Sequence, residues 1–99
     1  MARFDVYANR SGEGFLLDVQ ADLITKLNTR VVVPLIPLDA APVPAARLNP
    51  IFEVQGSKVL MATQFMAAVP NSELVTQIAS LDRESDAIFS ALDFLHHGW

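Results

Sequence analysis

The sequence predicts a mainly β fold, a small barrel of short antiparallel strands, followed by one C-terminal α-helix. Near the N-terminus, apolar and polar residues alternate with a period of two, as they do in half-buried strands. In the second half of the chain, two β-rich segments flank the dipeptide Gly56-Ser57, which is typical of a tight hairpin. Only residues 80–99 have the apolar spacing of a strong helix.

The composition indicates one globular domain. A chain of 99 residues is long enough for one domain and too short for two, and 52% hydrophobic residues supply its core. A net charge of −4 with only seven Lys and Arg disfavours direct binding to nucleic acid, because that binding neutralises phosphates. The absence of Cys excludes disulfides, and prolines interrupt the most apolar stretch. We therefore expect a soluble, cytoplasmic protein without a membrane segment.

The first third of the chain predicts a hairpin. Residues 4–8 and 15–20 have strand-like alternation, and residues 9–14 between them are dense in turn formers. The segment that follows the hairpin carries three apolar residues, Leu23, Ile24 and Leu27. They either cap the end of the barrel, which is the commoner use of such residues, or form an exposed binding patch.

The middle of the chain begins with a β-branched run, residues 29–38, whose composition indicates a strand buried on both faces. Pro34 and Pro37 lack the amide hydrogen that a central strand donates, so we expect this strand to bend or to lie partly at an edge. Residues 39–50 then form the longest connection, with one short helical turn near its end.

The clearest hairpin joins residues 51–55 to residues 58–63. Its two-residue loop, Gly56-Ser57, has the leading Gly of a type II′ turn. Residues 64–69 predict a strand or an irregular segment, and residues 71–80 are ambiguous, with a strand followed by a turn as the favoured interpretation.

The C-terminal helix is expected to begin after Asp82, a competent N-cap, and to end at Gly98. Its apolar arc spans roughly 220°, which is wider than the ~100° that packing on one core needs. Part of the arc is therefore left for a second surface. Trp99 follows Gly98, the expected end of the helix. Its side chain either folds back onto the domain or is presented to a partner, and residue type alone favours folding back, because most Trp side chains are largely buried. The arc consists of Ala87, Ile88, Phe89, Ala91, Leu92, Phe94 and Leu95.

Residues with catalytic chemistry are scarce. The only two histidines, His96 and His97, are adjacent at the C-terminus, which is a poor place for a preorganised acid–base site. Asp93 and His97 share one helical face, but a structural metal site needs about four ligands. No phosphate-binding glycine loop or hydrolase motif is present. We expect no enzymatic activity, no metal and no cofactor.

Taken in order, the residues resemble the CcdB family, the toxin half of a bacterial toxin–antitoxin pair. The resemblance runs through FDVYANR from Phe4, FLLDVQADLI from Phe15, RVVVPLIPL from Arg30, FMAAVP from Phe65, and the acidic helix. It implies a homodimer with an SH3-like barrel of the kind shared with the MazF and Kid ribonucleases. It also implies a toxin that is not an enzyme, and that binds the A subunit of DNA gyrase and stabilises the DNA-cleaved complex.

The resemblance also implies a contact site for gyrase. In the family the chain finishes with an aromatic residue, a Trp, a Gly and an aliphatic residue, whereas here the Trp follows the Gly. Either Trp99 takes the same role from its new position, or activity toward gyrase is weakened or directed at another target. The residues implied in gyrase binding are Leu23, Ile24, Asp93, His96, His97, Gly98 and Trp99.

With the resemblance in hand, the wide apolar arc has an explanation: one flank packs on the barrel and the other meets a second copy across a two-fold axis. The residues expected at this dimer interface are Ile88, Phe89, Leu92 and Leu95. A cognate, CcdA-like antitoxin would neutralise the toxin and join it in repressing their operon. The antitoxin would then supply the DNA contacts that this acidic chain lacks.

Two other functions stay open. The altered C-terminus is compatible with a homologue that has lost its activity on gyrase and serves as an antitoxin-binding module. A ribonuclease of the MazF and Kid type is the least favoured function. Such an enzyme needs an acid–base set, and no histidine in the predicted core could belong to it. The candidates for that set are Arg3, Asp18, Arg30 and Glu53.

Overall fold

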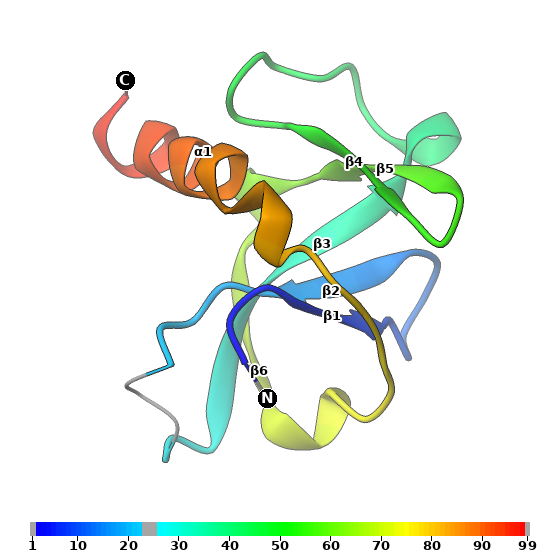
Figure 1. The fold of residues 1–99 in the computed structure, drawn as a ribbon, viewed down its shortest axis with the longest axis vertical. Helices are drawn as coiled ribbons and strands as arrows, with labels where there is room; N and C mark the ends of the chain where they lie inside the picture. The colour runs from blue at the N-terminus through cyan, green and yellow to red at the C-terminus, as the bar shows by residue number, and fades with distance from the viewer. Residues whose placement is uncertain (1, 23–25, 99) are drawn as a thin grey trace.

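The computed structural model describes residues 2–22 and 26–98, in which one curled antiparallel sheet wraps beneath a single α-helix (Figure 1). The strands are β1 (Asp5–Ala8), β2 (Phe15–Asp18), β3 (Thr29–Pro37), β4 (Ile51–Val54), β5 (Ser57–Met61), β6 (Ala67–Pro70) and β7 (Gln77–Ser80). The helices are the 3-10 turns η1 (Leu38–Ala40), η2 (Thr63–Phe65), η3 (Asn71–Glu73) and η4 (Asp82–Glu84), and α1 (Ser85–His97). The prediction of a mainly β fold with one C-terminal helix is confirmed, and the sheet is a half-barrel.

The sheet has the order β4-β5-β3-β2-β1-β7, and β6 pairs with β3 outside this path. One edge of β3 pairs with β2, and the other edge is shared between β6 and β5. The partner changes beside Pro34, whose carbonyl accepts the N–H of Ala62 at 2.9 Å. A strand residue points its nitrogen and its carbonyl to the same side, so the missing amide hydrogen of Pro34 faces the gap between β5 and β6. The strand is therefore central, and Pro34 lies where the second edge of β3 passes from β6 to β5.

The predicted hairpin between β4 and β5 is confirmed, but its loop lies one residue earlier than expected. Val54 pairs with Ser57, which leaves Gln55 and Gly56 as the two loop residues. Both have positive φ, 51° and 80°. Two positive φ values define a type I′ turn, whose twist matches that of the flanking strands, so the predicted type II′ turn is wrong.

The segment before α1 also differs from the prediction. The expected strand followed by a turn is reversed, because η3 comes first and β7 then pairs with β1. Asp82 begins η4 and makes no side-chain cap, and α1 starts only at Ser85. The predicted end is confirmed: Gly98 has φ 80° and its N–H donates to the Phe94 carbonyl at 2.9 Å. A left-handed residue at this position is the usual helix stop, and Gly adopts it without strain.

The main core lies between the inner face of the sheet and α1, which contributes Ile88 and Ala91. Val6 and Leu17, which face each other on β1 and β2, point into this core. Tyr7 points to the opposite face, as the alternation predicts, but a second small cluster with Val32 and Leu74 buries it there. None of the described helices is long and apolar enough to cross a membrane.

Candidate functional site

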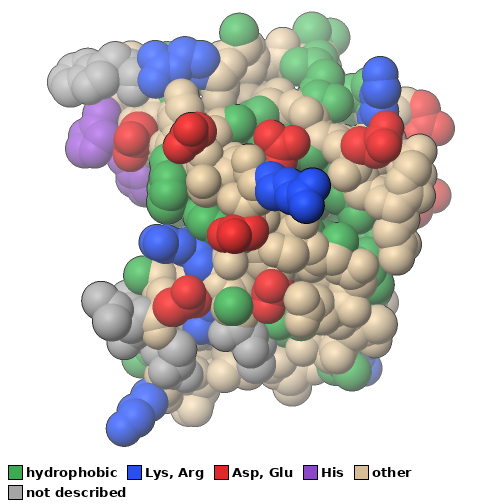
Figure 2. All heavy atoms as spheres, viewed as in Figure 1, with side chains coloured by type: hydrophobic (Ala, Val, Ile, Leu, Met, Phe, Trp, Pro, Cys, Tyr) green, Lys and Arg blue, Asp and Glu red, His purple; other side chains and the backbone are tan. Residues whose placement is uncertain are grey.

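The carbonyl end of α1 carries most of the residues implied in partner binding. Asp93, His96, His97 and Gly98 are all exposed there, and Figure 2 shows both histidine side chains at the surface. The Nδ1 atom of His96 lies 2.9 Å from the Leu92 carbonyl, a contact that orients this imidazole along the helix. The carbonyl end of the helix is therefore open to solvent. Trp99 lies outside the described residues.

The segment after β2 is described only at its two ends. Leu23 and Ile24, both implied in gyrase binding, lie outside the described residues. Leu27 is 49% exposed, so it does not cap the barrel end as expected. Asp22 is exposed, and its Oδ1 accepts the backbone N–H of Arg3 at 2.7 Å. Asp22, at the start of this segment, is thus bonded to the N-terminal part of the chain.

The N-terminus forms a tight turn, Ala2–Asp5. The N–H of Asp5 donates to the Ala2 carbonyl at 3.1 Å, and an Asp5 carboxylate oxygen accepts the N–H of Ala2 at 2.9 Å. Phe4, the third residue of this turn, has φ 76°. Positive φ in a bulky residue costs about 1–3 kcal/mol and persists only where the surrounding structure imposes it. Here the surroundings are β2 and the residue before η4, since Phe4 N–H donates to the Asp18 carbonyl and the Phe4 carbonyl accepts from Leu81.

Arg3 lies on two aromatic rings beside α1. Its Cζ atom is 5.2 Å from the centroid of Phe4 and 5.1 Å from that of Phe89, and the two rings meet edge to face at 5.4 Å. Cation–π contacts of this kind contribute about 0.5–1 kcal/mol at exposed sites. Sequence reasoning missed this contact, because it joins the two ends of the chain and no spacing rule links them.

The opposite flank of α1 carries a second stacked arginine. The Cζ atom of Arg47 lies 5.2 Å from the centroid of Phe94, and its Nε donates to Ser90 Oγ at 3.3 Å. Two aromatic residues of the wide apolar arc are thus partly covered by cations of the same chain. The surface left over for a partner is smaller than the sequence indicates.

The residues expected at a dimer interface fall into three classes of burial. Ile88 has no exposed surface and belongs to the main core, so it is not available to a second chain in this fold. Leu92 is half-buried and packs against the same core. Phe89 and Leu95 are each 39% exposed. The helical period placed all four on one arc, but only packing decides which of them the barrel covers.

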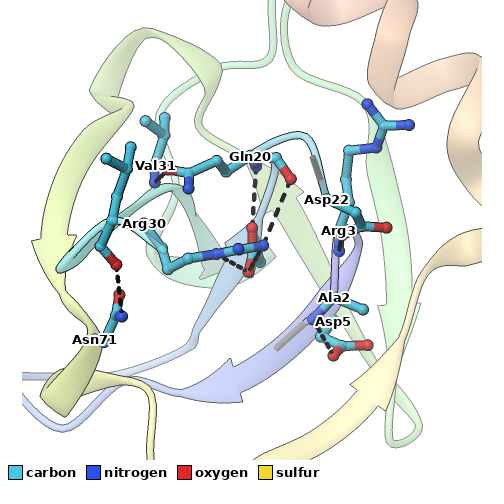
Figure 3. A network of polar contacts seen from close by, with 10 residues as sticks. Ala2, Arg3, Asp5, Gln20, Asp22, Arg30, Val31 and Asn71 are labelled. Atoms are coloured by element: carbon cyan, nitrogen blue, oxygen red, sulfur yellow. Dashed lines mark hydrogen bonds and ion pairs between the residues drawn. The ribbon is translucent and has the colours of Figure 1, made fainter. Parts of the chain in front are cut away.

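A buried polar network lies at the end of β2 (Figure 3). The Nε and Nη2 atoms of Arg30 lie 2.8 and 2.7 Å from Asp18 Oδ2, and Asp18 Oδ1 accepts the backbone N–H of Gln20 at 3.0 Å. Gln20 Oε1 in turn accepts the N–H of Val31 at 3.1 Å. Burial raises the pKa of the Asp18 carboxyl, and the hydrogen bonds from Gln20 and Arg30 oppose this rise. The network joins β2 to β3.

The acid–base set considered for a ribonuclease does not come together as a site. Only Asp18 and Arg30 are in contact, and their side chains are 0% and 2% exposed. Glu53 lies on β4, which β5 and β3 separate from the strand of Asp18. No pocket and no cluster of metal ligands occurs among residues 2–22 and 26–98.

Comparison with known protein families gives a match over almost the whole chain. The family described as CcdB protein matches residues 3–98 of the chain. No protein of curated function matches it.

Proposed function

Because the chain belongs to the CcdB family, we propose that it is a toxin that binds the A subunit of DNA gyrase and traps the DNA-cleaved complex. The family consists of toxins of toxin–antitoxin pairs that act on gyrase as poisons rather than as enzymes. The match over residues 3–98 carries the proposal, since it includes the sheet and the whole of α1.

The proposed contact surface is centred on the open end of α1. It includes the exposed residues Asp93, His96, His97 and Gly98. A helix end that is free of other elements suits a protein partner, because side chains there are accessible without rearrangement of the core. By the family resemblance, the surface also includes Leu23, Ile24 and Trp99.

We further propose a homodimer, in which exposed apolar residues of α1 from two copies meet at an isologous interface. Phe89 and Leu95 are the members of the predicted set with the largest exposed fraction, and Leu92 lies between them. A CcdA-like antitoxin would cover the toxin in the cytoplasm and repress their operon with it. DNA would be bound through the antitoxin, because the chain has a net charge of −4.

An antitoxin-binding module without gyrase activity is the second candidate. The observation that favours it is the C-terminal order His96-His97-Gly98-Trp99, in which imidazoles replace an aromatic residue and a Trp. An imidazole offers a smaller ring face and less desolvated area to a target arginine than an indole does.

The test incubates the purified protein with gyrase, ATP and supercoiled plasmid, and separately with RNA. The proposed function predicts linear plasmid that appears after denaturation of the gyrase, with intact RNA. Cleaved RNA without linear plasmid would contradict it. If neither product forms, the antitoxin-binding module is the better interpretation.

A further inference from the structure

Arg47 lies in a strained turn on the connection between η1 and β4. The N–H of Leu48 donates to the Ala46 carbonyl at 2.8 Å, across Arg47, whose φ is 68°. A hydrogen bond that spans one residue at positive φ marks the rare and strained kind of γ-turn. Glycine adopts such a backbone without strain, whereas this position carries one of the longest side chains. The turn therefore has a conformational cost that a smaller residue would avoid.

A buried asparagine holds this turn in place. Asn49 is 4% exposed, and its Oδ1 accepts the N–H of Ala45 at 3.1 Å. Its own N–H donates to the Ala45 carbonyl at 2.9 Å, and its Nδ2 donates to the carbonyl of Met61, in β5, at 3.1 Å. These bonds join the two sides of the turn and fasten it to the sheet. A strained residue persists only where the surrounding structure imposes its conformation, and Asn49 supplies that constraint around Arg47.

The turn places the Arg47 side chain against the C-terminal half of α1, beside which the connection passes in Figure 1. Its Cζ atom lies 5.2 Å from the ring centroid of Phe94, and its Nε donates to Ser90 Oγ at 3.3 Å. Within residues 2–22 and 26–98, its two Nη atoms make no hydrogen bond and the residue forms no ion pair. Arg47 is also exposed. Its terminal N–H donors are thus held in one orientation at the surface.

A guanidinium held in this way suits a carboxylate. Its planar N–H groups match the two oxygens of a carboxylate or a phosphate in parallel hydrogen bonds. The phosphates of nucleic acid are disfavoured, because the chain has a net charge of −4 and the same helix exposes Asp86 and Asp93. A single cation among acidic residues can still bind one carboxylate. The chemistry therefore favours an Asp or Glu side chain of a protein.

We propose that Arg47 binds the carboxylate of an Asp or Glu side chain of a protein partner at the edge of the contact surface on α1. Phe94, on which the guanidinium lies, follows Asp93 and precedes His96, both of which belong to that surface. The inference rests on the proposed function, because it takes the A subunit of gyrase as the partner. A side chain that is ordered before binding loses less conformational entropy on binding, which raises the affinity. The competing role is structural, with Arg47 serving only to cover Phe94.

A small ligand tests the carboxylate site without gyrase. Isotope-labelled protein is titrated with N-acetylglutamate N-methylamide, and the Nε–H resonances of the arginines are followed by nuclear magnetic resonance. The resonance of Arg47 should shift at least about threefold more than that of Arg83, an exposed arginine of η4. The neutral glutamine analogue should not produce this difference. Equal shifts of the two arginines, or equal effects of the two ligands, would overturn the proposal.

Binding to purified gyrase A subunit tests the partner. Arg47→Met removes the guanidinium and keeps an unbranched stem that can lie on Phe94, and it should weaken the affinity roughly tenfold. Arg83→Met is the matched control, since it removes the same charge near the start of α1. Its affinity should stay within about twofold of the wild type. Equal losses in the two variants would show that only overall charge matters, and would overturn the proposal.

Arg47→Gly separates binding from folding, because it removes the side chain and also the strain at positive φ. Its melting temperature should stay within about 2–4 °C of the wild type, while its affinity for gyrase A subunit falls as in Arg47→Met. A large fall in the melting temperature with unchanged affinity in Arg47→Met would assign Arg47 to the fold and overturn the proposal.

The two experiments also distinguish failure of this inference from failure of the proposed function. Wild-type protein that does not bind gyrase A subunit would contradict the proposed function. A selective shift of the Arg47 resonance would then still support the carboxylate site, and the lack of such a shift would overturn it.

Discussion

The buried network at the end of β2 and the open end of α1 are both polar, yet they differ in how far their polar side chains are exposed to solvent. Asp18 and Arg30 are almost fully buried and bond to each other and to Gln20. Asp93, His96 and His97 are exposed, and solvent reaches all three. Polar groups that are buried together inside the chain stabilise one fold, whereas exposed polar groups can be reached by another protein. The difference supports a structural role for the first region and agrees with the proposed role of the second in partner binding.

The largest expected effect comes from breaking the buried pair. Arg30→Met leaves the Asp18 carboxylate buried without its cation, so we expect a loss of about 3–5 kcal/mol in the free energy of unfolding. Urea denaturation measures it. The control is Arg10→Met, which removes an exposed pair with Glu73 at 3.7 Å and should cost less than about 1 kcal/mol. Equal losses in the two variants would mean that burial does not distinguish the pairs.

A smaller loss is expected inside α1. Ile88→Ala removes a fully buried side chain from the core and should cost about 2–4 kcal/mol in unfolding free energy. Leu95→Ala, at a 39% exposed position of the same helix, should cost about 1 kcal/mol or less but weaken self-association, as measured by analytical ultracentrifugation. If Ile88→Ala weakens self-association at unchanged stability, the assignment of Ile88 to the core is wrong.

The smallest effect on stability is expected at the C-terminus. Under the proposed function, in which the C-terminal residues contact the target, Trp99→Ala, or removal of Gly98 and Trp99, should cost no more than about 0.5 kcal/mol in unfolding free energy and lower the melting temperature by no more than about 2–4 °C. Trapping of cleaved plasmid by gyrase should be lost. A large fall in melting temperature with trapping retained would show that the C-terminal residues serve the fold and not the target.

Local sequence rules account for much of the sheet. Alternation identified β1 and β2, the β-branched run identified β3, and the loop at Gly56 identified the hairpin of β4 and β5. The rules did not predict the order of η3 and β7, which are short segments without strong periodicity. The structure of such segments depends on the strands with which they pair. The rules also missed the turn at Phe4, because its positive φ is imposed by β2 and by Leu81 from elsewhere in the chain.

The sequence by itself determined the fold class, the end of α1 at Gly98, and a likeness to the CcdB family that the comparison over residues 3–98 then showed. Only the tertiary structure decided which residues of α1 the barrel covers, that Asp18 and Arg30 form a buried pair, and that Arg3 joins the segment after β2 to Phe89. The physical reason is range: periodicity, caps and turns act between neighbours in sequence. Burial and cation–π contacts depend on chain segments that meet only after folding.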